Sequence, residues 1–289
     1  ILDEESNFEV ATNHFKGRGY TYFDEEKNAY LPTAFHASFT IFVYENVLLK
    51  NHIHKRYWVV FCNIISSLLL AISILYFYKL SLHLIGPELA GACTLSYCIF
   101  PSVLYYIGSL FWYEQTVLSL LIVAIFLIIK SLKEKLSLTE YILLTFSIII
   151  SSLFRIQTIA IFAPLLAFLI LYLAFQKQFQ KSLIYGLIAL AGFAAHVPSL
   201  QKNRAIYGSY ILSTQTGYEI LQGHNPEAKG SWMGNWLLPG SALYQYSHQN
   251  IPFIETLNQY EEGQARKALA IQWIKAHPMD ELKLILRKM

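Results

Sequence analysis

The sequence carries little charge for its length. Of its 289 residues, 55% are hydrophobic and only 14% are Asp, Glu, Lys or Arg. Soluble domains usually contain about 25% charged residues, and the mean hydropathy here is +0.39. This is too little charge to cover a globule in water, so we expect lipid to be part of the solvent around this chain. The small formal net charge of +3 also argues against a nucleic-acid-binding surface.

Cysteine is also scarce. Its three copies, Cys62, Cys93 and Cys98, all lie inside apolar stretches. The spacing of the last two fits neither a tight metal-binding motif nor a disulfide framework. We interpret all three as small apolar side chains.

Motifs typical of many soluble enzymes are missing. The sequence has no Walker loop, no Rossmann glycine fingerprint and no nucleophile elbow. The histidines lack the helical spacing of a zinc site, because His52 and His54 would point to opposite sides of a helix, or to the same face of a strand. We therefore expect histidines such as His196 to pack in the membrane interface and to bind no metal.

Long apolar runs are what the sequence has in abundance. They cover residues 57–84, 87–108, 110–130, 136–153, 156–175 and 182–199. A bilayer core of about 30 Å needs about 20 helical residues, and helices satisfy their own backbone groups in lipid. The sequence therefore predicts an all-α fold, with a polytopic bundle of about six transmembrane helices over residues 57–199.

Two polar sections flank the predicted bundle. Residues 1–56 are expected to form an acidic outer-face loop, followed by an amphipathic interfacial helix from Phe35 to Leu49. Residues 200–289 are expected to form an outer-face loop and a helical segment near residues 255–275. The chain starts without Met and stops abruptly after a basic helix, so we expect a segment of a longer protein.

Basic loops orient the predicted bundle. Lys130–Lys135 and Gln176–Lys181 are separated by two spans, so they lie on one side, which the positive-inside trend makes cytoplasmic. Lys50, Lys55 and Arg56 oppose this trend, but the reverse orientation would place both basic loops outside. The segments then predicted outside are residues 1–56, 108–114, 153–156 and 200–289.

Three carboxylates are predicted near the outer face. Asp3 and Glu4 belong to an acidic run beside the membrane surface, and a solvated surface is the plainer interpretation of such a run. Glu114 lies just inside an apolar span, where a carboxylate is costly and tends to face a cavity or a partner. The alternative for Glu114 is an acid stabilised by the dipole of its own helix.

Three cations are predicted on the same side. Arg155 lies between two spans, where it would either snorkel to the interface or clamp a phosphate with its guanidinium group. Lys202 and Arg204 follow the last apolar run. Together these side chains would converge where the head of an anionic lipid sits.

Several stretches, in this order, resemble one family. The matching stretches are Asp3-Glu4 through Ala11 to Gly17–Tyr20, Pro101–Glu114, Arg155, Pro198–Arg204, Gly217, Gly223–Pro226, Gly230–Trp232 and Ala268–Pro278. They resemble the GT-C glycosyltransferases that use lipid-phosphate sugars, in the branch of the protein O-mannosyltransferases and the lipid A aminoarabinose transferases. The family's first and C-terminal spans have no counterpart here. Its aromatic residue after the acidic pair is displaced to Phe8.

The resemblance implies a function. It implies inverting transfer of a sugar from a polyprenyl-phosphate donor to a hydroxyl of a lipid, protein or polysaccharide acceptor. The reaction would take place on the extracytoplasmic side of a bacterial plasma membrane. Asp3 would act as the base, with Glu4 or Glu114 positioning the acceptor or sharing the proton. The residues that would hold the donor phosphate are Arg155, Lys202 and Arg204. The sequence requires no cofactor, and a divalent metal is compatible with the family.

Two other functions remain open at this stage. A flippase or transporter of lipid-linked saccharides would share the spans and the cations, but the inverted repeats and broken helices of transporters are not seen. A non-catalytic scaffold subunit of the cell envelope would tolerate simultaneous neutral replacement of Asp3, Glu114 and Arg155.

Overall fold

The chain folds into two compact units in a computed structural model. The structure describes residues 2–18, 21–24, 29–32, 43–51, 55–100, 113–230 and 240–288. Unit 1 comprises residues 1–12 and 36–200, and unit 2 comprises residues 13–35 and 201–289. The boundary after residue 200 falls at the end of the predicted bundle, whereas the predicted outer-face section, residues 1–56, is divided between the two units.

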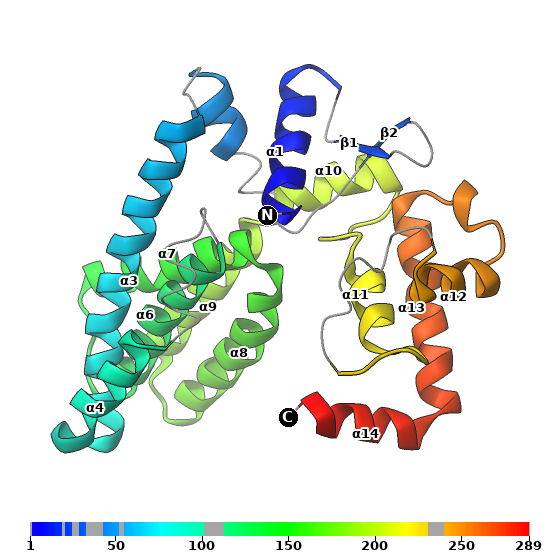
Figure 1. Cartoon of the computed structure of the whole chain (residues 1–289). Helices are drawn as coiled ribbons and strands as arrows, with labels where there is room; N and C mark the ends of the chain where they lie inside the picture. Colours follow the sequence, from blue (N-terminus) through cyan, green and yellow to red (C-terminus); the bar gives the residue numbers. More distant parts are fainter. Residues whose placement is uncertain are drawn as a thin grey trace. The chain divides into compact units, whose positions relative to one another are not determined.

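Unit 1 is built from helices (Figure 1). Its long helices are α3 (Lys55–Ile85), α4 (Pro87–Cys98), α6 (Tyr113–Lys133), α7 (Leu138–Phe154), α8 (Ile159–Phe175) and α9 (Phe179–Ala194). A π-helical turn, η1 (Tyr44–Leu49), precedes them, and a 3₁₀ turn, η2 (Ile156–Thr158), joins α7 to α8. Helix α10 (Val197–Tyr207) begins in unit 1 and ends in unit 2.

Local sequence sets several of these helix ends. Ser137 and Glu140 form a reciprocal capping box at the start of α7, in which each side chain accepts from the other's backbone N–H. Gly86 separates α3 from α4 with a φ of 81°, a conformation that favours glycine, and Pro87 then opens α4.

Within the described ranges, four helical segments are long and apolar enough to cross a membrane. They are Asn63–Ile85, Gln115–Lys133, Ile156–Phe175 and Phe179–Tyr207. Helix α7, in the predicted span 136–153, is apolar but shorter. Of the predicted span 87–108, the structure describes α4, which ends at Cys98, while residues 101–112 lie outside the described residues. Membrane-length apolar helices are therefore present, and the six-span bundle stays a prediction.

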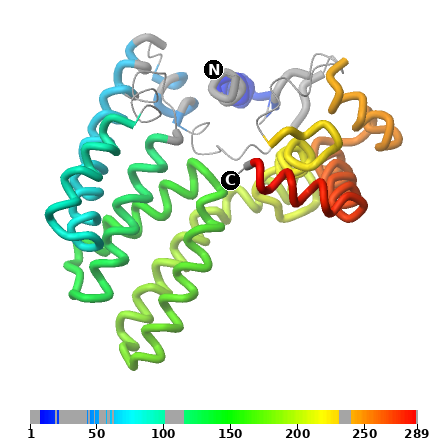
Figure 2. Tube along the Cα trace, turned by 60° about the horizontal axis from the view of Figure 1, so that its bottom comes forward, coloured from blue at the N-terminus to red at the C-terminus, as the bar shows by residue number. Residues whose placement is uncertain are grey.

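The helices of unit 1 pack as antiparallel neighbours. Helices α6 and α7 form one hairpin and α8 and α9 another, which Figure 2 shows as two adjacent green rods. The Lys181 ammonium donates to the Ser131 carbonyl over 3.0 Å, which joins the start of α9 to the end of α6. The two basic loops therefore lie at the same end of unit 1, as the sequence predicts, and the side of the membrane that they face stays a prediction.

Helix α6 lies at the centre of unit 1. In the membrane-length segment of α6, 67% of the residues are buried, against 17% in that of α3. Its Leu127 packs with Leu144 of α7, Leu169 of α8 and Tyr185 of α9 in one core. The outer helices turn large apolar side chains outward instead, among them Leu75, Phe168 and Leu190. Such a surface is unfavourable in water and suits lipid.

The N-terminal section differs from the predicted loop. Asp3 and Glu4 lie in a helix, α1 (Leu2–Phe15), and not in a loop. The predicted interfacial helix from Phe35 to Leu49 is described only near its end, where η1 lies.

Unit 2 contains a short hairpin and a group of helices. Strands β1 (Thr21–Asp24) and β2 (Ala29–Pro32) pair antiparallel, with Thr21 opposite Pro32 and Asp24 opposite Ala29. This hairpin is absent from the all-α prediction, although aromatic and β-branched residues favour strands there. The helical elements are α11 (Thr216–Gly223), α12 (Ala242–Asn250), η3 (Ile254–Thr256), α13 (Gln259–Ala276) and α14 (Pro278–Lys288). Helix α13 lies close to the predicted 255–275 helix, and its start is set by a capping box between Asn258 and Glu261.

The core of unit 2 depends on close packing of α11 against α13 (Figure 1). Gly217 and Gly263 meet there, and a Cβ added to Gly217 would lie 1.7 Å from the Gly263 carbonyl oxygen. Beside this contact the buried Arg266 pairs with Glu262 at 2.6 Å and donates to Ser247 over 2.8 Å. The absence of both glycine side chains is therefore what lets the two helices approach.

We expect Gly217→Ala to destabilise unit 2 by about 3 kcal/mol, because the new methyl group overlaps a backbone carbonyl and forces the helices apart. Gly186→Ala in α9 is the matched control, since a Cβ there meets nothing within 4 Å and alanine favours helix. The stability of unit 2 in the two variants is measured by heating the detergent-solubilised chain and following proteolysis of the α11–α13 region. Equal stability of the two variants would contradict the close contact.

Candidate functional site

One end of unit 1 is polar. Because α6 and α7 are antiparallel, the start of α6 and the end of α7 lie together, at the end opposite the basic loops. Val117 of α6 and Phe154 of α7 pack in one buried cluster there. Glu114 lies one turn before Val117, and Arg155 directly follows Phe154. The fold therefore brings the backbone positions of Glu114 and Arg155 to the same end of unit 1.

Buried polar side chains gather at this end. They are Gln115, Thr116 and Ser119 of α6, Ser151 and Ser152 of α7, Thr158 of η2, and His196 after α9. We call this group, with Arg155, the polar end. The Thr116 hydroxyl is buried and forms no hydrogen bond within the described part of the chain. Burying an unpaired hydroxyl is unfavourable, so this position costs stability within the described part of the chain.

A hydrogen bond between His196 and Ser152 joins α7 to the residue that follows α9. His196 Nε2 lies 3.0 Å from Ser152 Oγ, and both side chains are buried. The Ser152 hydroxyl donates to the Ile149 carbonyl over 2.8 Å. Because serine has one hydroxyl proton, His196 must then carry its proton on Nε2 and donate to Ser152. This contact fixes the end of α7 one turn before Arg155.

Arg155 interrupts the helix between α7 and η2. Its φ and ψ of −136° and 107° are extended, and its backbone N–H donates to the Ser151 carbonyl over 2.8 Å. The Thr158 hydroxyl donates to the Arg155 carbonyl over 2.8 Å. Arg155 is half-buried. It thus lies in a turn between two apolar helices, where the sequence predicted it.

The predicted acids are described only by their backbone. Asp3 and Glu4 lie in α1, within unit 1, and Glu114 lies in the first turn of α6. Their side chains fall outside what the structure describes, so their proposed roles in proton transfer stay predictions. Among the described residues, no three or more His, Cys, Asp or Glu side chains form a group that would hold a metal ion.

Two of the three predicted cations belong to unit 2. Lys202 and Arg204 lie on α10, beyond the boundary at residue 200. The exposed Arg204 guanidinium donates to the Tyr210 hydroxyl and lies 4.7 Å from the centre of the Tyr210 ring. Stacking of this kind holds a guanidinium in place. The convergence of Lys202 and Arg204 with Arg155 stays a prediction.

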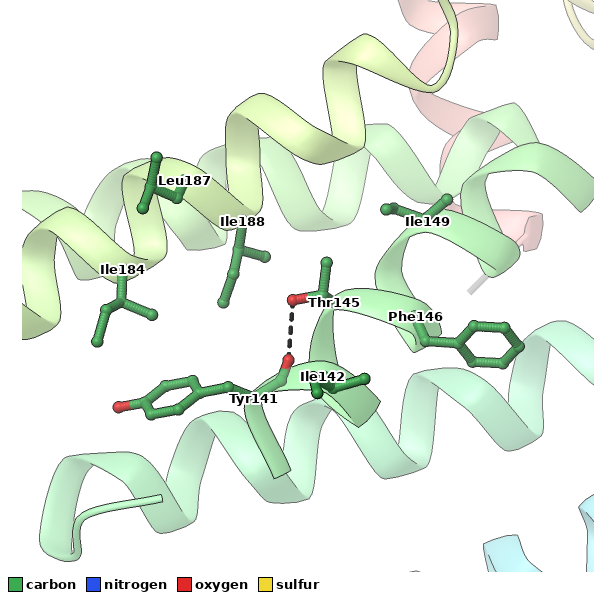
Figure 3. A pocket seen from close by; sticks show the side chains of 8 residues that line it. All are labelled: Tyr141, Ile142, Thr145, Phe146, Ile149, Ile184, Leu187 and Ile188. Carbon is green, nitrogen blue, oxygen red and sulfur yellow. Dashed lines mark hydrogen bonds between the residues drawn. The ribbon is translucent and has the colours of Figure 1, made fainter. Parts of the chain in front are cut away.

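An apolar groove runs between α7 and α9 (Figure 3). It encloses about 480 Å³ and opens to the outside of unit 1. The residues that line it are Tyr141, Ile142, Thr145, Phe146 and Ile149 of α7, and Ile184, Leu187 and Ile188 of α9. The Thr145 hydroxyl donates to the Tyr141 carbonyl over 2.8 Å, so it is satisfied within its own helix. The groove is therefore suited to a hydrocarbon chain.

The groove and the polar end are continuous along α7. Ile149 lines the groove, and its carbonyl accepts the hydrogen bond from Ser152. Ser152 lies one turn further along α7 and bonds His196. A molecule with an apolar tail and a polar head would find both surfaces within a few helical turns.

Comparison of the chain with protein-family models, with curated proteins and with solved structures finds no match.

His196 was expected only to pack in the membrane interface. The structure buries its imidazole and bonds it to Ser152. The available signal was weak. His196 stands at the end of an apolar run, and its partner lies 44 residues earlier in the chain. Periodicity within one helix does not reveal such a pair.

We expect Ser152→Ala to lower the free energy of unfolding by about 2 kcal/mol, because it leaves the buried Nε2–H of His196 without an acceptor. Ser67→Ala is the matched control. Ser67 also lies in a long apolar helix and donates to a carbonyl of its own helix, but it is exposed. Denaturant unfolding in mild detergent measures both. If the two variants behave alike, the His196–Ser152 bond contributes nothing to stability.

Proposed function

We propose that this chain belongs to a membrane glycosyltransferase that moves a sugar from a polyprenyl-phosphate donor to an acceptor hydroxyl. The resemblance stated from the sequence motivates the proposal. The structural observation that supports it most is the shared position of Glu114 and Arg155 at the end of unit 1 opposite the basic loops. An acid and a cation at one membrane surface are the groups that such a transfer requires.

The reaction is an inverting displacement. The Asp3 carboxylate takes the proton of the acceptor hydroxyl, whose oxygen attacks the anomeric carbon of the sugar. The bond from that carbon to the phosphate oxygen breaks, and the lipid phosphate leaves with an added negative charge. Glu4 or Glu114 positions the acceptor or shares the proton.

Arg155 stabilises the leaving phosphate. A guanidinium group offers two parallel N–H donors to phosphate oxygens. It acts more strongly where water is excluded, and Arg155 is half-buried beside the hydroxyls of the polar end. Lys202 and Arg204 would add to this charge during the reaction.

The groove between α7 and α9 would take the polyprenyl tail. It is apolar, open to the outside of unit 1, and ends one turn before Ser152. Placing the tail there would put the phosphate near Arg155. This also explains why such an enzyme would need membrane helices, because the donor never leaves the bilayer.

We expect Asp3→Asn to lower kcat about 10³-fold, because the base is lost. We expect Arg155→Ala to lower kcat about 10²-fold, because the cation that binds the leaving phosphate is lost. The matched controls at the basic end are Glu134→Gln and Lys135→Ala, which remove an acid and a cation from exposed positions. Consumption of radiolabelled polyprenyl-phosphate hexose by the intact protein in proteoliposomes gives the rates.

Three results would contradict the proposed function or the role of Asp3 in it. Full activity of Asp3→Asn would remove Asp3 from the role of base. Movement of the donor across the bilayer by the wild type, without its consumption, would show a flippase. If wild type and all variants leave the donor unchanged and in place, a scaffold subunit is the remaining function.

A separate prediction concerns binding of the donor tail in the groove. We expect Leu187→Trp to fill it and raise KM for a long-chain donor about tenfold, because a few buried methylene groups contribute about that much to binding. KM for a donor with one isoprene unit should not change. Leu190→Trp is the control, since Leu190 also lies exposed on α9 but outside the groove. An equal increase for both chain lengths would show general damage to the site.

A further inference from the structure

Helix α14 (red in Figure 1) is anchored to unit 2 by one of its faces. Leu284 on this face is 3% exposed. On the same face the Glu281 carboxylate lies 2.9 Å from Nδ1 of His224, which follows α11. Glu281 and Leu284 are three residues apart and therefore point in the same direction. These two contacts fix the rotation of α14 about its own axis.

A second face of α14 is apolar and exposed. Met279, Leu282 and Leu286 follow one another at intervals of three and four residues, so they form a stripe along the helix, with Ile285 at its edge. Their exposed fractions are 65% for Met279, 48% for Leu282, 63% for Leu286 and 44% for Ile285. Because the opposite contacts hold the helix in place, it cannot turn this stripe inward.

The third face is charged. Asp280 and Lys283 form an ion pair at 3.0 Å, which leaves the exposed Arg287 as net positive charge on this face. An apolar stripe beside a face with basic residues is the arrangement of helices that lie in the plane of a membrane interface. Basic residues at the edge of such a stripe lie at the depth of anionic lipid head groups.

We propose that the apolar face of α14 inserts into the interfacial zone of the bilayer and binds unit 2 to the membrane surface. Its partner is the lipid acyl and head-group boundary. The chain itself brings this partner close, because the candidate span Phe179–Tyr207 ends inside unit 2 and tethers it to the bilayer. A tether raises the local concentration of membrane, so even a short amphipathic helix binds. The inference does not depend on the proposed enzymatic function.

Site-directed spin labelling of the intact protein in nanodiscs of phosphatidylethanolamine and phosphatidylglycerol tests this. Single cysteines replace Leu286 on the apolar face or Lys283 on the charged face, in a background without the native cysteines. Both positions are exposed, so the fold should tolerate the label. Oxygen partitions into lipid, whereas a neutral nickel chelate stays in water. We expect the ratio of oxygen to nickel accessibility to be about tenfold higher at Leu286 than at Lys283, since an interfacial helix buries its apolar face some 5–10 Å deep.

Two outcomes would overturn the inference. High nickel accessibility at both positions would show that α14 lies in water. Low accessibility to both reagents at Leu286 would show that protein covers the stripe. The far-ultraviolet circular dichroism and unfolding temperature of the labelled proteins, compared with the wild type, establish that α14 remains folded in each case.

Discussion

The burial of α6 among apolar neighbours is the constraint on which unit 1 depends. Helix α6 packs against both α3 and α7, and it supplies a large part of the core that α8 and α9 complete. Its two ends differ in chemistry. Gln115, Thr116 and Ser119 stand at its start, whereas Lys130 near its end pairs with Glu140 at 2.7 Å. The direction of this one helix therefore gives unit 1 its polarity, by which we mean the chemical difference between its two ends.

That polarity connects the stability of unit 1 with its proposed chemistry. Low local dielectric strengthens an interaction between a guanidinium and a phosphate, and it also makes an unpaired buried hydroxyl costly. The hydrogen bond between His196 and Ser152 spares these two side chains that cost. The Thr116 hydroxyl does not avoid it within the described part of the chain. The apolar groove and the polar end then form two adjoining surfaces of opposite character along α7.

Much of unit 1 was predictable from the sequence, because hydrophobic length and basic loops are local signals. The positions of α6, α8 and α9, and the shared end of the basic loops, follow from them. The short hairpin of residues 21–32 was missed, since four-residue strands leave little periodicity to detect. The helix at Asp3 was missed because an acidic run is equally typical of a solvated loop. Contacts such as Gly217 with Gly263 join residues 46 positions apart, and no local pattern reveals them. For the site, the sequence indicated Arg155 in its turn but not the bond of His196 to Ser152 one turn earlier.

Unit 2 is assembled from two separate pieces of chain, residues 13–35 and residues 201–289. During synthesis the first piece leaves the ribosome early, and the 165 residues of positions 36–200 must follow before its partners exist. At typical translation rates this delay is on the order of 10 to 30 s. The segment that holds β1 and β2 is therefore made well before the helices that complete unit 2. The close contact of Gly263 on α13 with Gly217 on α11 can form only after that delay.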